Sequence, residues 1–189
     1  MKLIGKNSIS TFISYVLFAG FLFFSYTFII EFSAFVISFA NLRTGSTFLN
    51  ETFYVWKEGA SQTAFFKFHY PFTNQQLAFG RLDLYTAIKY LSGMLFLVLS
   101  FFFGYKIFRS MGTEKLFNSS VIMWLKRFSI LNTFYAFFFP VLLYFTFGKV
   151  IVESIVSALA LLALGIMVYF IVEFFKKGYE IQSENDLTI

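Results

Sequence analysis

The stretch TFISYVLFAGFLFFSYTFIIEFSAFVISFA, residues 11–40, decides the fold, because Glu31 is its single charged residue. A helix that crosses a bilayer needs about 20 predominantly apolar residues. Further apolar stretches of this kind follow at residues 84–105, 128–148 and 150–175. Together they predict an all-α membrane protein in which four transmembrane helices form a single membrane domain, residues 1–189.

The composition also indicates that lipid is the main solvent of this chain. Of its 189 residues, 58% are hydrophobic and only 13% are charged, whereas globular domains carry about 25% charged residues. The formal net charge of +5 indicates contact with anionic lipid and a fixed orientation, and no direct nucleic-acid partner is expected. The absence of cysteine from the sequence excludes disulfides and thiolate catalysis.

The loop between the first two spans, residues 41–83, has the pattern of a small β-hairpin. Its two strand-like segments are Thr47–Trp56 and Thr63–Phe72. In the second segment aromatic side chains alternate with Lys67 and His69, a period of two that is typical of a strand with one covered face. The sequence therefore predicts an extracytoplasmic β-hairpin between helices one and two.

Lysine and arginine residues set the expected orientation. The N-terminus, the inner loop at residues 106–127 and the tail at residues 176–189 hold most of them at high density. Because positive residues accumulate on the cytoplasmic side of membrane proteins, both termini of this multi-pass protein are predicted to be cytoplasmic.

Local signals refine two of the spans. Asn118, Ser119 or Ser120 can cap a helix that runs into the third span. In the fourth span, Ser154, Ala158 and Gly165 fall on one helical face, and small residues at such spacing allow helices to approach closely in lipid.

Four ionisable residues lie inside or at the edges of the predicted spans and form a predicted polar cluster: Glu31, Lys89, Lys149 and Glu153. Charges at membrane depth are costly and usually pair or face water. Two interpretations stay open for this cluster, a structural one at the membrane interface and a functional polar pocket. If Glu31 and Lys89 form a pair, replacing either one is expected to destabilise the fold.

No catalytic, cofactor or metal site is predicted. The only histidine, His69, has no second histidine, cysteine or carboxylate cluster near it in the sequence. The sequence also lacks a nucleophile elbow and a phosphate-binding glycine loop. The chain is therefore expected to be non-enzymatic.

The C-terminal tail is a candidate partner-binding segment, because an acidic turn precedes an apolar end, although disorder is the default for a terminus. Its last six residues are Glu184, Asn185, Asp186, Leu187, Thr188 and Ile189. This ending resembles that of the membrane proteins known as the domain of unknown function 2975 family, and Tyr70-Pro71-Phe72-Thr73 is similar to a segment of that family as well. The inner segment Leu116-Phe117-Asn118 is similar to a third family segment, except that Leu116 stands where proline is common.

The resemblance implies a four-span bacterial inner-membrane protein of unassigned function, encoded beside a small helix-turn-helix regulator. A cytosolic partner of that kind, or other membrane subunits, would then bind it. The first expectation is a regulatory, scaffolding or accessory subunit that binds a protein partner. The alternative is a small transporter, exporter or immunity-type protein that handles a hydrophobic compound.

Overall fold

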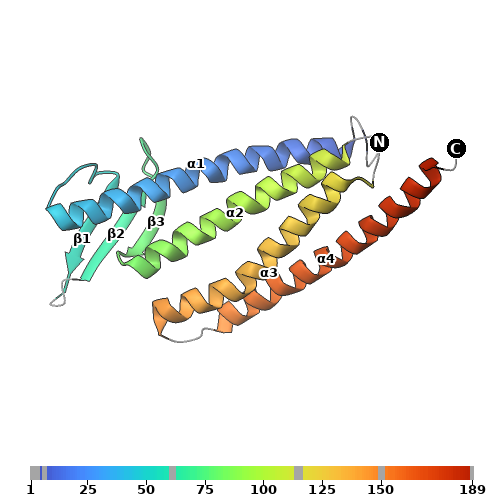
Figure 1. Ribbon diagram of the computed structural model, residues 1–189. Helices are drawn as coiled ribbons and strands as arrows, with labels where there is room; N and C mark the ends of the chain where they lie inside the picture. Colours follow the sequence, from blue (N-terminus) through green and yellow to red (C-terminus); the bar gives the residue numbers. More distant parts are fainter. Residues whose placement is uncertain (1–4, 6–7, 60–62, 113–116, 149–151, 188–189) are drawn as a thin grey trace. The chain divides into compact units, whose positions relative to one another are not determined.

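Four long helices and one small antiparallel sheet form the described part of this computed structural model (Figure 1). The structure describes residues 5, 8–59, 63–112, 117–148 and 152–187. In chain order the elements are α1 (Ile9–Thr44), β1 (Phe53–Glu58), β2 (Thr63–His69), β3 (Gln76–Arg81), α2 (Leu84–Met111), α3 (Ser119–Phe147) and α4 (Val152–Leu187). All four helices are long and apolar enough to cross a membrane, which confirms the predicted number of long apolar helices.

The chain divides into two compact units. Phe24–Leu95 forms one, called here the sheet unit, and Met1–Phe23 together with Phe96–Ile189 forms the other, called the helical unit. The helices α1 and α2 contribute residues to both units.

The sheet has three strands in the order β1-β2-β3, all antiparallel. The predicted hairpin corresponds to β1 and β2, but β1 runs from Phe53 to Glu58 rather than from Thr47 to Trp56, and β2 ends at His69 rather than at Phe72. The third strand was not predicted, because its sequence QLAFGR contains glycine and alanine and no β-branched residue. It pairs with β2 through an irregularity at Phe68 and His69.

The core of the sheet unit is aromatic. Phe66 and Phe68 of β2 are fully buried. The ring of Phe35, from α1, lies 5.1 Å from the ring of each of them, and both contacts are edge-to-face. Such pairs add about 0.5–1.5 kcal/mol each beyond the burial of their area. The inner face of the sheet is therefore held on the C-terminal part of α1.

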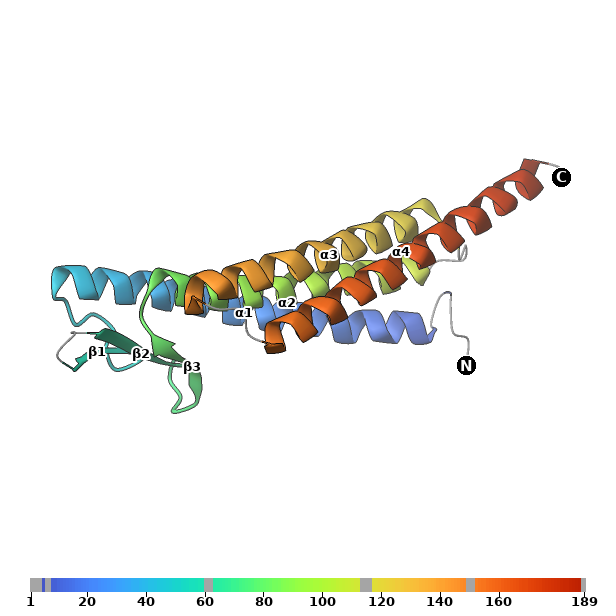
Figure 2. The same ribbon diagram turned by 90° about the horizontal axis from the view of Figure 1, so that it is seen from below.

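In the helical unit α3 and α4 run side by side, as both ribbon views show (Figures 1 and 2). The hydroxyl of Ser129 in α3 donates a hydrogen bond to the carbonyl oxygen of Gly165 in α4 at 2.7 Å. Gly165 and Ser154 are both buried, as the small-residue face of the fourth span predicted.

The start of α3 also agrees with its sequence signal. The Oδ1 atom of Asn118 accepts a hydrogen bond from the backbone N–H of Val121 at 2.9 Å, so Asn118 is the N-cap. Its amide nitrogen donates to the carbonyl oxygen of Ser110 in α2 at 3.2 Å. One asparagine therefore caps α3 and ties its start to the end of α2.

Candidate functional site

The predicted polar cluster is described only in part. Lys149 lies outside the described residues, and Glu153 belongs to α4 but its side chain is not described. Glu31 and Lys89 both belong to the sheet unit, on α1 and α2. The structure therefore brings two of the four predicted residues into one unit and does not place the other two side chains.

Glu31 lies on a buried stripe of α1. The buried residues along this face are spaced alternately four and three positions apart: Thr27, Glu31, Ala34, Ser38 and Asn41. The Glu31 side chain is only 1% exposed, and its Oε2 atom has no hydrogen-bond partner among the described residues. A buried carboxylate oxygen without a donor is costly.

Tyr90 of α2 follows Lys89 and connects this helix with the sheet, although the sequence did not single it out. The Lys89 amino nitrogen lies 5.2 Å from the centre of the Tyr90 ring. The Tyr90 hydroxyl donates to the carbonyl oxygen of Phe79 in β3 at 2.9 Å. Only the arrangement of α2 against the sheet could reveal this role.

The residues of the predicted tail belong largely to α4. Because α4 continues to Leu187, Glu184 and Asn185 are exposed helical residues and not parts of a disordered segment. Asp186 and Leu187 are helical too, with side chains that are not described, and Thr188 and Ile189 lie outside the described residues.

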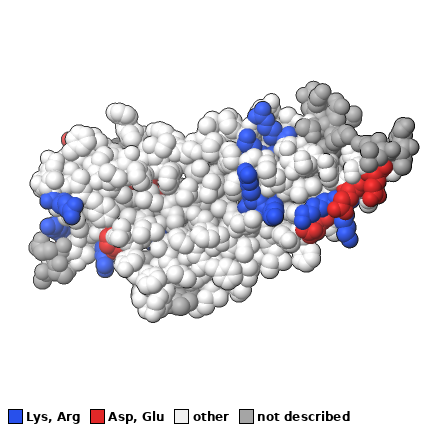
Figure 3. All heavy atoms as spheres, viewed as in Figure 1, with Lys and Arg blue, Asp and Glu red and all other residues white. Residues whose placement is uncertain are grey.

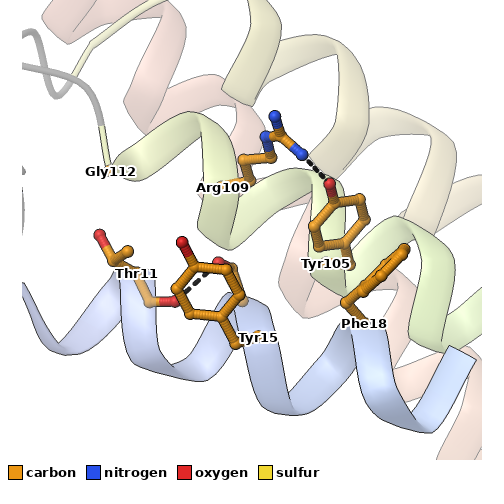
Figure 4. A pocket seen from close by; sticks show the side chains of 7 residues that line it. Thr11, Tyr15, Phe18, Tyr105, Arg109 and Gly112 are labelled. Carbon is orange, nitrogen blue, oxygen red and sulfur yellow. Dashed lines mark hydrogen bonds between the residues drawn. The ribbon is translucent and has the colours of Figure 1, made fainter.

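A different site was missed by sequence reasoning. A cavity of about 430 Å³ opens in the helical unit, between the first turns of α1 and the last turns of α2 (Figure 4). It is lined by Thr11, Ser14, Tyr15, Phe18, Tyr105, Arg109 and Gly112. Because these residues come from segments some ninety positions apart, no local motif could indicate the cavity.

The α2 side of the cavity carries a positioned cation. The Arg109 guanidinium donates a hydrogen bond to the hydroxyl of Tyr105, four residues earlier on α2, as the dashed line in Figure 4 marks. Tyr105 is buried, and its ring packs on the ring of Phe18 with centroids 5.0 Å apart. A rigid tyrosine thus holds the arginine beside the cavity.

The α1 side of the cavity carries hydroxyl groups. The Ser14 hydroxyl donates to the carbonyl oxygen of Thr11 at 2.7 Å, and the ring of Tyr15 is 68% exposed. Gly112 lets the two helices approach, because a Cβ atom at this position would lie 3.2 Å from Oγ1 of Thr11.

Basic and aromatic side chains surround this end of the helical unit and form a basic–aromatic belt. The Lys106 amino nitrogen lies 5.5 Å, 5.6 Å and 5.7 Å from the ring centres of Phe102, Tyr105 and Trp124. The Arg127 guanidinium lies 4.6 Å from the centre of the Trp124 ring. Figure 3 shows Lys and Arg gathered over α2 and α3 of this unit, whereas on the far part of α4 acidic and basic groups lie side by side.

A second cavity of the helical unit is apolar. About 420 Å³ lies between α3 and α4, beside the hydrogen bond of Ser129 to Gly165. Its other lining residues are Ile130, Thr133, Phe134, Ile166 and Tyr169.

The sheet unit presents a third feature, two aromatic and basic cross-strand rows on the outer face of its sheet. Strand register aligns Tyr54, Lys67 and Phe79 in one row and Trp56, Phe65 and Arg81 in the other. The rings stack around Trp56, whose centroid lies 5.3 Å from that of Tyr54, 5.7 Å from that of Phe65 and 6.1 Å from that of Phe79. Tyr54 and Phe79 are about half exposed.

No protein-family model, curated protein or solved structure matches this chain. The resemblance to the domain of unknown function 2975 family therefore stays a prediction. Among the described residues no three His, Asp or Glu side chains gather into a group that could hold a metal ion.

Proposed function

We propose that this chain is a non-enzymatic, multi-pass protein of a bacterial inner membrane, and that it acts as a scaffolding or accessory subunit. The outer face of its sheet binds a protein partner on the extracytoplasmic side. Both termini lie in the cytoplasm, where the end of α4 is available to a cytosolic partner such as a helix-turn-helix regulator.

Exposed apolar side chains support the membrane part of the proposal. Large residues such as Tyr15, Leu22 and Ile29 of α1 are more than half exposed. Lipid solvates such surfaces, whereas contiguous apolar patches are rare on soluble monomers. The basic–aromatic belt supports the orientation, because lysine and arginine are enriched at the cytoplasmic ends of spans and tryptophan at the interface.

The length of α1 supports an extracytoplasmic sheet. Its 36 residues extend over about 54 Å at 1.5 Å per residue, and the hydrocarbon core is only about 30 Å thick. The proposed topology directs the excess length, which carries Phe35 and the sheet, out of the bilayer.

The observation that carries the partner proposal is the outer face of the sheet. Tyrosine, tryptophan and arginine are the residues that contribute most of the binding energy at protein interfaces. Here the Trp56 ring lies among three other aromatic rings. Lys67 lies between two aromatic residues in one row, and Arg81 lies beside Phe65 at the end of the other row. A partner with an apolar centre and an acidic rim would complement this surface.

Site-specific photo-crosslinking in intact membranes tests this proposal. A photoreactive residue at Phe79, on the outer face, is expected to give one crosslinked species. The same residue at Phe72, which is fully exposed in the turn before β3, is the matched control and is expected to give none.

Two further variants sharpen the result. Trp56→Ser is expected to abolish the Phe79 crosslink, and removal of residues 178–189 is expected to leave it intact. Identical crosslinks from Phe72 and Phe79, or none from Phe79, would eliminate the outer face as the binding surface. Pull-downs in mild detergent, with and without residues 178–189, test the tail separately, and equal partner sets would exclude it.

The apolar cavity between α3 and α4 favours a second candidate, a small transporter or exporter of a hydrophobic compound. Its volume of about 420 Å³ and its apolar lining suit one drug-sized molecule. Retention of a lipophilic dye by cells with and without the protein tests this candidate, and equal retention would discard it.

A further inference from the structure

We propose that the cavity between the start of α1 and the end of α2 is a binding site for a phosphate group, supplied by the headgroup of an anionic phospholipid. This inference is independent of the protein partner proposed for the sheet. Only the lipid origin of the phosphate rests on the proposed membrane insertion.

The first argument for a phosphate site is the positive charge of the cavity. Arg109 lines it, and Lys106 lies on the same helix within 5.6 Å of the Tyr105 ring centre. Residues 9–23, 96–111 and 119–147 contain no acidic residue. The segments of α1 and α2 that line the cavity therefore carry positive charge and no carboxylate of their own, and Glu173 of α4 is paired with Lys176. An anion is the ligand that this field attracts.

The donors carry the second step. A guanidinium binds phosphate through several N–H groups in a fixed geometry. The bond to Tyr105 occupies one of those donors and holds the others in place. Tyr15 adds a hydroxyl group from α1, the other helix that lines the cavity (Figure 4), whereas the Thr11 hydroxyl donates to the carbonyl oxygen of Gly5 at 3.4 Å. A guanidinium and a tyrosine hydroxyl that line one cavity of about 430 Å³ suit one phosphate group.

The surroundings carry the third step and distinguish lipid from free phosphate. Phe18 lines the cavity and Leu22 follows one turn later on α1, and both side chains are exposed. An acyl chain could lie along this apolar surface while its headgroup remains at Arg109. Basic pockets between helices at the cytoplasmic interface are a known kind of headgroup site, and the basic–aromatic belt lies at the same end of the unit.

Native mass spectrometry of the full chain in detergent tests the proposal. The protein is titrated with phosphatidylglycerol, with phosphatidylcholine and with inorganic phosphate. We expect phosphatidylglycerol to bind at least tenfold more tightly than phosphatidylcholine. Arg109→Gln is expected to weaken phosphatidylglycerol binding about tenfold, because a charge-assisted contact is lost. Tyr105→Phe keeps the ring packing and is expected to weaken binding about threefold.

Arg127→Gln is the matched control, since it removes a cation of the basic–aromatic belt that does not line the cavity. The affinity of this variant for phosphatidylglycerol is expected to change less than twofold. Melting temperatures of all variants establish that they are folded, and Tyr105→Phe provides the test should Arg109→Gln not fold. Equal binding of both lipids, or an equal loss in Arg127→Gln and Arg109→Gln, would overturn the site. Arg109-dependent binding of inorganic phosphate without phosphatidylglycerol binding would overturn the lipid source.

Discussion

At the scale of single residues, Phe35 decides whether the sheet has a core. Its ring meets Phe66 and Phe68, each at 5.1 Å. Phe35→Ala is expected to lower the free energy of unfolding of the sheet unit by about 3–5 kcal/mol, because a large cavity replaces the ring. The fluorescence of Trp56 during thermal unfolding, in a Trp124→Phe background, reports this change.

Phe32→Ala is the control for that experiment, since Phe32 lies on the same helix but is 52% exposed. Its unfolding midpoint is expected to stay close to that of the parent protein. Equal losses from the two variants would mean that the edge-to-face contacts of Phe35 are not what holds the sheet.

Glu31 poses a different question at the same scale. Because Oε2 lacks a partner among the described residues, removing the charge is expected to relieve a cost. Glu31→Gln should therefore melt no lower than the parent protein in detergent. A clear decrease, together with non-additive decreases in a double-mutant cycle with Lys89→Met, would instead support the ion pair that the sequence suggested.

At the scale of elements, the contact of α3 with α4 depends on the absence of a side chain. A Cβ atom at Gly165 would lie 2.5 Å from Oγ1 of Thr133 and 3.2 Å from two backbone atoms of α3. Gly165→Leu is expected to force the helices apart and to cost about 1–3 kcal/mol. Thermal unfolding in detergent measures it against Ile166→Leu, a neighbour that is 48% exposed. Matching midpoints would contradict tight packing at this point.

The four helices could be predicted from the sequence because each apolar stretch exceeds the length that a globular core needs. Their ends could not, since α4 continues through charged residues to Leu187. The polar end of α4 makes local contacts, such as the ion pair of Lys176 with Glu173 at 2.6 Å. Such contacts at a spacing of three residues support a helix. The spans were predicted from the lengths of apolar stretches, which do not include these polar contacts.

The sheet and the phosphate site show where sequence reasoning stops. Strands β1 and β2 have alternating or aromatic sequences, and they were predicted. Strand β3 forms because β2 offers it an edge, and its own residues favour a strand weakly. Arg109 appeared in the sequence only as one of several positive charges. Its role beside Tyr105 and Tyr15 in one cavity depends on two helices meeting.

At the scale of the whole molecule, the lack of cysteine allows a direct test of topology. Phe72→Cys and Ser183→Cys each introduce a single exposed thiol. In intact cells or right-side-out vesicles, a membrane-impermeant maleimide is expected to label position 72 at once, and position 183 only after permeabilisation. The reverse pattern would invert the proposed orientation, and immediate labelling of both would mean that the two positions share one side.

The dependence of the sheet on α1 has a consequence for how the protein can be made and studied. The rings of Phe66 and Phe68 are covered by a side chain that belongs to another element. In an isolated peptide of residues 45–83 these rings would be exposed, and the peptide would aggregate. The loop cannot be detached from its anchor, and during biosynthesis that anchor, Ile9–Thr44, has already been synthesised when the strands emerge.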